Sequence, residues 1–378
     1  MTFRRIKPIV VKEFRQVRRD WVSLMLLILL PAFLMLMVGK ALNFDVKSVR
    51  LAVFDQDKSS QSRAFIRAFT NSGYFTIAAD VTSYRDIETS IESGRALAAL
   101  VIPADFAKRL DRGEDAPVQV LMDGSNNNTA TTALGYMNTI IQTYSANLRA
   151  EFMTRRGQRF DPPIELRPKV WYNPNLSSTK FLVPGFIGFI LMMSSVISTA
   201  LSIVREKESG TMEQLAVSPL GTAEIVIGKT LPYFIISLVS SAFVLGIAFV
   251  FFDLAVRGAI VWLYLGIVVF LFAALGQGLL ISAIAEKQQI AFMMAVLSSI
   301  LPTFLLSGLV FPIRSMPWLL QILSNVTPVK FFLIIIRGVM LKGVGPDVFW
   351  RELLYMLLFA AVTLALAAHI MLRKRRAA

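Results

Sequence analysis

The sequence predicts an α-helical polytopic membrane protein with six transmembrane helices and an α/β extracytoplasmic domain between helices 1 and 2. The first observation is composition: of 378 residues, 55% are hydrophobic and 17% are charged, and the mean hydropathy is +0.60. Soluble proteins carry about 25% charged residues. The second observation is that the apolar residues form runs long enough to cross a hydrocarbon core of about 30 Å as helices. The third is one long stretch, residues 43–180, in which basic and acidic residues nearly cancel.

Six apolar runs are long enough to be spans. They cover residues 21–42, 181–204, 231–252, 261–285, 290–311 and 349–372. The first run exceeds the hydrophobic region of a signal peptide, and Gly39-Lys40-Ala41 is a poor cleavage site, so we expect an uncleaved anchor. The other five form a membrane region over residues 181–372.

Basic residues near the span ends predict the orientation. The formal net charge of +14 could indicate nucleic-acid binding, but much of it lies at the two ends of the chain. Residues 1–20 contain seven basic residues and two acidic ones, Glu13 and Asp20. Residues 373–378 form a basic tail. By the positive-inside rule, we expect both termini to be cytoplasmic, and we expect no nucleic-acid partner.

The apolar residues of segment 1–20 recur at roughly helical spacing among the basic ones. This pattern predicts an amphipathic helix at the cytoplasmic surface of the lipid bilayer, with its apolar side toward the lipid. A solvated basic leader is the alternative.

Residues 43–180 alternate between strand-like and helical patterns, which predicts a periplasmic α/β domain. The expected strands cover residues 49–54, 75–81, 97–102 and 118–122, and residues 164–172 return to the membrane in an extended conformation. The expected helices cover residues 62–72, 84–93, 104–112 and 129–156.

Catalytic and metal-binding residues are not indicated. There is no cysteine and a single histidine, His369. Gly228-Lys229-Thr230 resembles the end of a phosphate-binding loop, but Ala223 stands where that motif needs glycine. We therefore expect no catalytic residue, no metal and no cofactor bound by this chain, and any ATP chemistry must come from a partner.

The middles of the six spans contain no Asp, Glu, Lys or Arg, which disfavours ion-coupled transport. Gln277 is the most polar side chain within a span. Its ordinary explanation is a hydrogen bond between helices. The alternative is a place on a translocation path.

The most informative segment is the charged stretch 205–229, REKESGTMEQLAVSPLGTAEIVIGK, which we expect as a cytoplasmic loop between spans 2 and 3. It resembles the permease subunits of ABC-2 type exporters, in which R-E-x-E-x-G-T-x-E-x-L…S-P…E…G-K joins these two spans. The topology is also similar to the subgroup with a large periplasmic domain after the first span. Residues 312–348 resemble that family's external re-entrant hairpin.

The resemblance implies a mechanism and partners. Two permease subunits would pair as a homodimer or heterodimer, and each would dock a separate ABC ATP-binding subunit that holds ATP and Mg²⁺. In the subgroup with a large periplasmic domain, this domain is thought to bind a periplasmic adaptor protein, so the resemblance implies such a partner here as well. The residues implied in coupling to the ATPase are Arg205, Glu206, Glu208, Gly210, Thr211, Glu213 and Leu215.

The resemblance therefore favours a membrane-spanning exporter subunit without its own ATPase site. An apolar spanning region suits a hydrophobic or amphipathic cargo such as a drug or lipid. Two alternatives remain. One is a membrane-anchored sensor or assembly scaffold whose periplasmic domain binds a ligand or partner; the other is a membrane-embedded enzyme.

Overall fold

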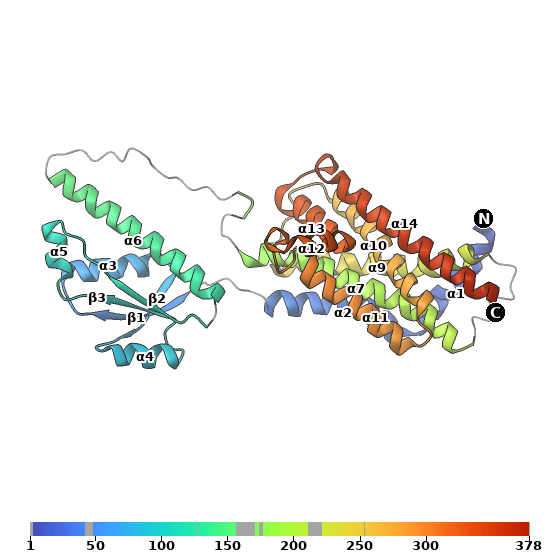
Figure 1. The fold of residues 1–378 in the computed structure, drawn as a ribbon, viewed down its shortest axis with the longest axis horizontal. Helices are drawn as coiled ribbons and strands as arrows, with labels where there is room; N and C mark the ends of the chain where they lie inside the picture. Colours follow the sequence, from blue (N-terminus) through green and yellow to red (C-terminus); the bar gives the residue numbers. More distant parts are fainter. Residues whose placement is uncertain are drawn as a thin grey trace. The chain divides into compact units, whose positions relative to one another are not determined.

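The computed structural model divides the chain into two compact units (Figure 1). Unit 1 consists of Met1–Asn43 and Val170–Ala378, and unit 2 is Phe44–Lys169. The structure describes residues 3–41, 48–125, 127–155, 171–173, 177–210, 221–252 and 254–377.

Unit 2 is built on a four-stranded sheet with the order β2-β1-β3-β4. Its strands are β1 (Val49–Asp55), β2 (Phe75–Asp80), β3 (Ala98–Ile102) and β4 (Gln119–Met122). The central strand β1 pairs in parallel with β2 and β3, whereas β4 runs antiparallel to β3. All five residues of β3 are buried, because helices cover both faces of the sheet.

The helices of unit 2 form two layers around this sheet. Helices α3 (Ser60–Asn71), α5 (Phe106–Arg112) and α6 (Asn127–Arg155) pack on one face through a phenylalanine-rich core. Helix α4 (Tyr84–Glu92) covers the other face, as Figure 1 shows. The result is an α/β fold, as the alternating pattern predicts.

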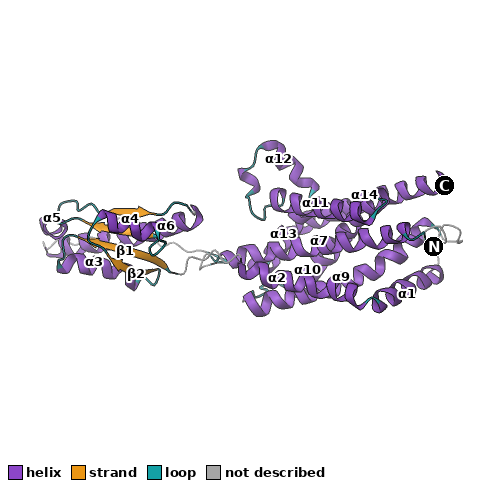
Figure 2. Ribbon diagram, turned by 90° about the horizontal axis from the view of Figure 1, so that it is seen from below, coloured by secondary structure: helices purple, strands orange, loops and turns teal. Residues whose placement is uncertain are grey.

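Among its described residues, unit 1 contains helices and connecting loops but no strand (Figure 2). Its long helices are α1 (Phe3–Arg19), α2 (Trp21–Ala41), α7 (Ser178–Glu208), α9 (Thr222–Phe252), α10 (Ile260–Ile284), α11 (Gln288–Leu306) and α14 (Pro346–Ala377). Among the described residues, five helices are long and apolar enough to cross a membrane, namely α7, α9, α10, α11 and α14. In α2 the apolar stretch among the described residues is Leu27–Lys40, which is shorter than any of these five helices.

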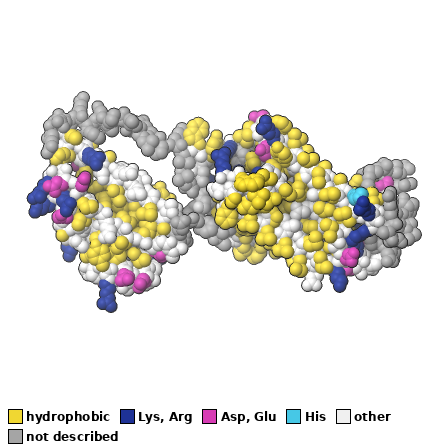
Figure 3. Space-filling model, in the orientation of Figure 1, with side chains coloured by type: hydrophobic (Ala, Val, Ile, Leu, Met, Phe, Trp, Pro, Cys, Tyr) yellow, Lys and Arg dark blue, Asp and Glu magenta, His cyan; other side chains and the backbone are white. Residues whose placement is uncertain are grey.

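Helix α10 is the most enclosed of these helices, and it packs against α7 and α14. Gly278 permits the close approach of α7, because a Cβ at this position would lie 2.8 Å from the carbonyl oxygen of Val196. By contrast, α9, α11 and α14 expose many large apolar side chains. Figure 3 shows the corresponding hydrophobic surface on one face of this unit, with charged side chains near its ends. Such a surface suits contact with lipid.

The segment before α14 forms a bent hairpin. It contains η1 (Ile313–Ser315), α12 (Trp318–Leu323), η2 (Ser324–Val326), α13 (Pro328–Arg337) and the π-helical turn η3 (Gly338–Lys342). The segments Trp318–Val326 and Pro328–Lys342 meet at 85°, and together they have the length and composition of a re-entrant loop or of one broken span. Counting that pair gives up to six candidate spans within the described residues.

Arg337 anchors this hairpin to the long helices. Its guanidinium donates hydrogen bonds to the carbonyl oxygens of Gly308 and Phe181, at 3.2 Å each, and lies 4.0 Å from the centre of the Phe181 ring. The hairpin is therefore held to the ends of α7 and α11.

The expected loop at residues 205–229 is shorter than predicted, because both flanking helices continue into it. Helix α7 extends to Glu208 and α9 begins at Thr222, whereas the sequence predicted spans ending at 204 and beginning at 231. Charged residues at these helix ends are stabilised by ion pairs with other helices, which a single segment of sequence cannot reveal. Residues 211–220, the rest of the expected loop, lie outside the described residues.

Candidate functional site

The candidate site is the last turn of α7 and the first turns of α9, which flank residues 211–220. Helix α7 ends at Glu208 with Ser209 as its C-cap, and Gly210 follows with φ +70°. This left-handed conformation is one that glycine adopts without strain, and it commonly terminates helices. Gly210 therefore stops α7 at a defined point before the segment that the sequence implicates in coupling.

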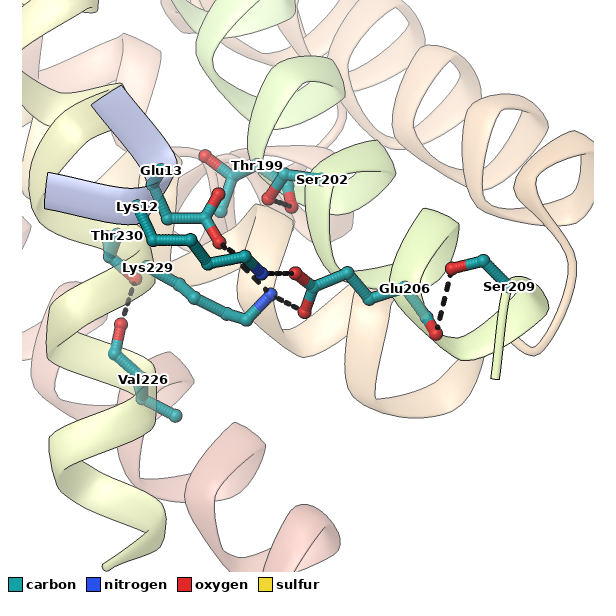
Figure 4. A network of polar contacts seen from close by, with 9 residues as sticks. All are labelled: Lys12, Glu13, Thr199, Ser202, Glu206, Ser209, Val226, Lys229 and Thr230. Carbon is teal, nitrogen blue, oxygen red and sulfur yellow. Dashed lines mark hydrogen bonds and ion pairs between the residues drawn. The ribbon is translucent and has the colours of Figure 1, made fainter. Parts of the chain in front are cut away.

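A buried cluster of four charged side chains joins this turn to two other helices (Figure 4). Glu206 on α7 forms an ion pair with Lys229 on α9, and its other carboxylate oxygen lies 2.5 Å from the Lys12 ammonium on α1. Glu13 on α1 lies 3.6 Å from Lys229 and 3.5 Å from Lys12. Glu206, Lys229 and Glu13 are 5%, 2% and 3% exposed, whereas the Lys12 side chain is about half exposed.

The four charges sum to zero, which is what allows them to be buried. An unpaired charge in a protein interior is very costly, whereas two acids and two bases in contact compensate one another. Burial opposes the charged form of Lys12, but its hydrogen bond to Glu206 and the charges of Glu206 and Glu13 raise its pKa above the usual value. Lys12 is therefore expected to stay charged at neutral pH.

Helix α1 reaches the cluster by packing on α9. Ile9, Glu13 and Val17 recur every four residues and are all buried. Gly228 makes room for them, because a Cβ there would lie 2.8 Å from the Cβ of Ile9. The sequence predicted that the apolar side of α1 faces lipid. In the structure this side packs at least partly on α9.

The next charged residues of α7 bind two further helix ends. Glu208 accepts a hydrogen bond from the backbone N–H of Gln288 at 2.8 Å, and another from its side-chain amide. A carboxylate at the first residue of α11 satisfies free backbone N–H groups and favours the positive end of the helix dipole. Arg205 lies 3.7 Å from the Asp20 carboxylate and 3.5 Å from the amide oxygen of Gln288.

Lys207 binds the end of α10. Its ammonium donates hydrogen bonds to the carbonyl oxygens of Ser282 and Ala285. Cations are favourable at helix C-termini because the last carbonyl groups lack partners within the helix. Four consecutive residues of α7 therefore contact the ends of α9, α10 and α11, the helix α1, and Asp20 between α1 and α2.

Arg205, Glu206 and Glu208 lie at the end of α7, and Gly210 follows this helix. Thr211, Glu213 and Leu215 lie outside the described residues. Glu206 is buried, so the direct contact with an ATPase implied by the resemblance does not fit its position. The coupling role of the other residues stays a prediction.

Sequence reasoning missed Lys12, Glu13 and Lys229 as members of this site. The available signal was Glu13, an acidic residue on the apolar stripe of a basic helix. The sequence analysis noted Lys229 in an incomplete phosphate-binding motif and at the end of the family motif, and the structure places it in the ion cluster.

Gln277 donates hydrogen bonds to the hydroxyl and carbonyl oxygens of Ser298, at 3.0 and 3.3 Å, and so links α10 to α11. This is the ordinary role that the sequence suggested for a polar side chain within a span. Its place on a translocation path stays untested.

Several apolar helices long enough to cross a membrane, with their charged residues in contact at the helix ends, are typical of a polytopic membrane protein. The sequence model of the family described as "ABC-2 family transporter protein" matches residues 18–369, and the chain belongs to this family. The resemblance to ABC-2 permeases is thereby confirmed.

Curated relatives support the same family. The chain is 32% identical over 373 residues to the "Probable multidrug ABC transporter permease YbhR" of Escherichia coli (strain K12), covering 99% of each protein. It is 31% identical over 375 residues to the "Probable multidrug ABC transporter permease YbhS" of the same strain, covering 97% of this chain and 96% of that protein. The "Inner membrane transport permease YhhJ" of that strain is 26% identical over 308 residues, with 80% of each covered.

Proposed function

We propose that this chain is the membrane-spanning permease subunit of an ATP-driven exporter. It forms the translocation path as a dimer and couples to a separate ATP-binding subunit, which holds ATP and Mg²⁺. Family membership and the apolar helices of unit 1 support the transport role. The names of two relatives support a drug or another hydrophobic or amphipathic compound as the substrate class.

The observation that carries the coupling proposal is the last turn of α7. It adjoins residues 211–220 in sequence, and its side chains bind α1 and the ends of α9, α10 and α11. A force applied to residues 211–220 would therefore act on several helices at once. Rigid helices with two alternative packings are what an ATP-driven change between inward- and outward-facing states requires.

The residues of the site divide into two roles under this proposal. Thr211, Glu213 and Leu215 would contact the ATP-binding subunit, since they follow the point where Gly210 ends α7. Glu206 and Lys229 would be positioning residues, because they are buried and act by holding α7, α9 and α1 together. Arg205 and Glu208 are exposed and bind neighbouring helices, so they could serve both roles.

The orientation follows from the same proposal. The site would face the cytoplasm, where ATP is available, with both termini on that side of a bacterial inner membrane. Unit 2 would then lie in the periplasm, where its α/β fold could meet an adaptor protein or act near the exit.

The test is purification of the tagged full-length chain in mild detergent, with its partners identified by mass and with ATPase activity measured. We expect a stoichiometric ATP-binding subunit. Charge reversal by E213K should reduce its co-purification, whereas E206Q should retain the subunit but lower the transport obtained per ATP hydrolysed. Glu286 forms an exposed pair with Lys374, so E286Q is the matched control and should behave as wild type.

Absence of any ATP-binding partner from a monodisperse preparation would contradict the proposal and favour the sensor or scaffold. If E206Q and wild type gave equal transport per ATP hydrolysed, the positioning role of the ion cluster would be contradicted. The proposed permease function would not be affected by that result.

A further inference from the structure

We propose that α1 carries a binding site for the headgroup of an anionic phospholipid. The site is a groove of about 810 Å³ along the helix, and its lining includes Pro8, Val11, Lys12, Arg15 and Arg19. It goes beyond the transport function, because lipid binding at α1 requires neither ATP nor a partner subunit.

The first argument is the charge of the groove. Lys12, Arg15 and Arg19 are spaced by three and four residues, so they share one side of the helix. Asp20 also lines the groove, but Arg205 lies 3.7 Å from its carboxylate and offsets its charge. Lys12 is paired with Glu206, whereas neither Arg15 nor Arg19 forms an ion pair with any residue that the structure describes.

Arg15 and Arg19 are therefore two like charges one helical turn apart, an arrangement that destabilises a helix unless an anion neutralises it. A phosphate group suits this position, because arginine binds phosphate oxygens through two parallel N–H donors. Several Lys and Arg residues on an amphipathic helix are also the pattern typical of sites for anionic lipids.

The second argument is the position of the groove beside the apolar helices. The backbone N–H of Asp20 donates to the carbonyl oxygen of Gln16, and that of Leu24 donates to Asp20, so hydrogen bonds bridge the junction of α1 and α2 at Asp20. The groove therefore ends immediately before Trp21, which is 61% exposed. Tryptophan is enriched where membrane meets water, which places the groove at the depth of the headgroups.

The third argument is the mixed lining. Pro8 and Val11 lie in the same groove as the three basic residues, so its ligand should be an anion with apolar groups attached. A phospholipid meets this requirement, and a free phosphate ion meets only its charged part. The side of α1 that carries Ile9, Glu13 and Val17 is buried against α9, so, as far as the described residues show, the groove side is the one available to a ligand.

The experiment is native mass spectrometry of the delipidated full-length protein in detergent, titrated with phosphatidylglycerol or phosphatidylcholine. Wild type should bind the first phosphatidylglycerol more tightly than phosphatidylcholine. The double variant R15Q/R19Q should lose about thirtyfold in affinity for phosphatidylglycerol, from the usual contribution of two basic residues at an anionic surface. Its affinity for phosphatidylcholine should not change.

The matched control is R85Q/K108Q, which removes two exposed positive charges from unit 2 and should keep the lipid preference. The variant R15K/R19K should retain most of the preference, which also shows that the helix folds. Competition by millimolar inorganic phosphate would show that free phosphate, rather than lipid, is the ligand, and would overturn the proposal.

An unchanged lipid preference in R15Q/R19Q would also overturn it. If R15Q/R19Q kept that preference and lost the ATP-binding subunit instead, the groove would be assigned to protein docking. Loss of the lipid preference with the ATP-binding subunit still bound would support the lipid site, whatever the outcome for transport.

Discussion

Replacing Glu206 with glutamine removes the negative charge that contacts both lysines of the buried cluster. In E206Q, Glu13, at 3.6 Å, would be the one acidic neighbour of Lys229 left among the described residues, although the Lys229 side chain is 2% exposed. Breaking a buried ion pair by removing one partner typically costs about 3–5 kcal/mol. Because Glu13 still offsets part of the charge of Lys229, we expect a loss of about 3 kcal/mol in the free energy of unfolding.

The pair can be separated from its surroundings by a double-mutant cycle. K229M should cost a similar amount, since it removes the buried lysine that forms an ion pair with Glu206. The double variant E206Q/K229M should cost at least about 1 kcal/mol less than the sum of the two single changes, because residues in contact are not additive. The assay is unfolding of the purified chain in mixed micelles with increasing denaturing detergent.

The exposed pair of Glu286 and Lys374, 3.5 Å apart, provides the control. E286Q should change the free energy of unfolding by less than about 0.5 kcal/mol, since exposed ion pairs contribute little. Strictly additive effects in the cycle, or an E206Q variant as stable as E286Q, would refute the reasoning that the cluster is a coupled unit.

Three further predictions concern other parts of the chain. G228V should destabilise the protein by about 1–3 kcal/mol and expose α1 to proteolysis, because the new side chain would collide with that helix; limited digestion measures this. In unit 2, the hydrogen bond from Arg109 lowers the pKa of Asp105 below its ordinary value. Its carboxylate therefore contributes stability above about pH 4, which is lost as the pH falls through the lowered value, and D105N should remove that pH dependence from acid-unfolding curves. Q277L should lose less than about 1.5 kcal/mol, since its bonds to Ser298 are single interhelical contacts, and an altered substrate profile at equal stability would instead support a translocation-path role.

Much of unit 2 could be predicted because its signals are local. The expected strand at residues 97–102 is observed as Ala98–Ile102, and the helix expected at 84–93 is observed as Tyr84–Glu92. In that helix Ser83 accepts a hydrogen bond from the N–H of Asp86, a cap formed by residues three apart. Patterns of this kind lie within a few residues and are visible in one sequence.

The ion cluster could not be predicted in the same way. Lys12 and Glu206 are 194 positions apart, and their contact depends on how α1 packs on α9. The charged end of α7 was for the same reason assigned to a loop, since nothing near Arg205 in the sequence indicates that its partners are Asp20 and Gln288. The family resemblance identified this stretch as important, but not the role of Glu206 in it.

The buried cluster also restricts how this chain can change during evolution. A basic residue at position 206 would face Lys229 and Lys12, so it could be accepted only with an acidic residue at one of those positions. Positions 12, 13, 206 and 229 should therefore vary together among homologues, with their summed charge kept at zero. If they do, the contact between α1, α7 and α9 could be detected from an alignment of homologous sequences, without a structure.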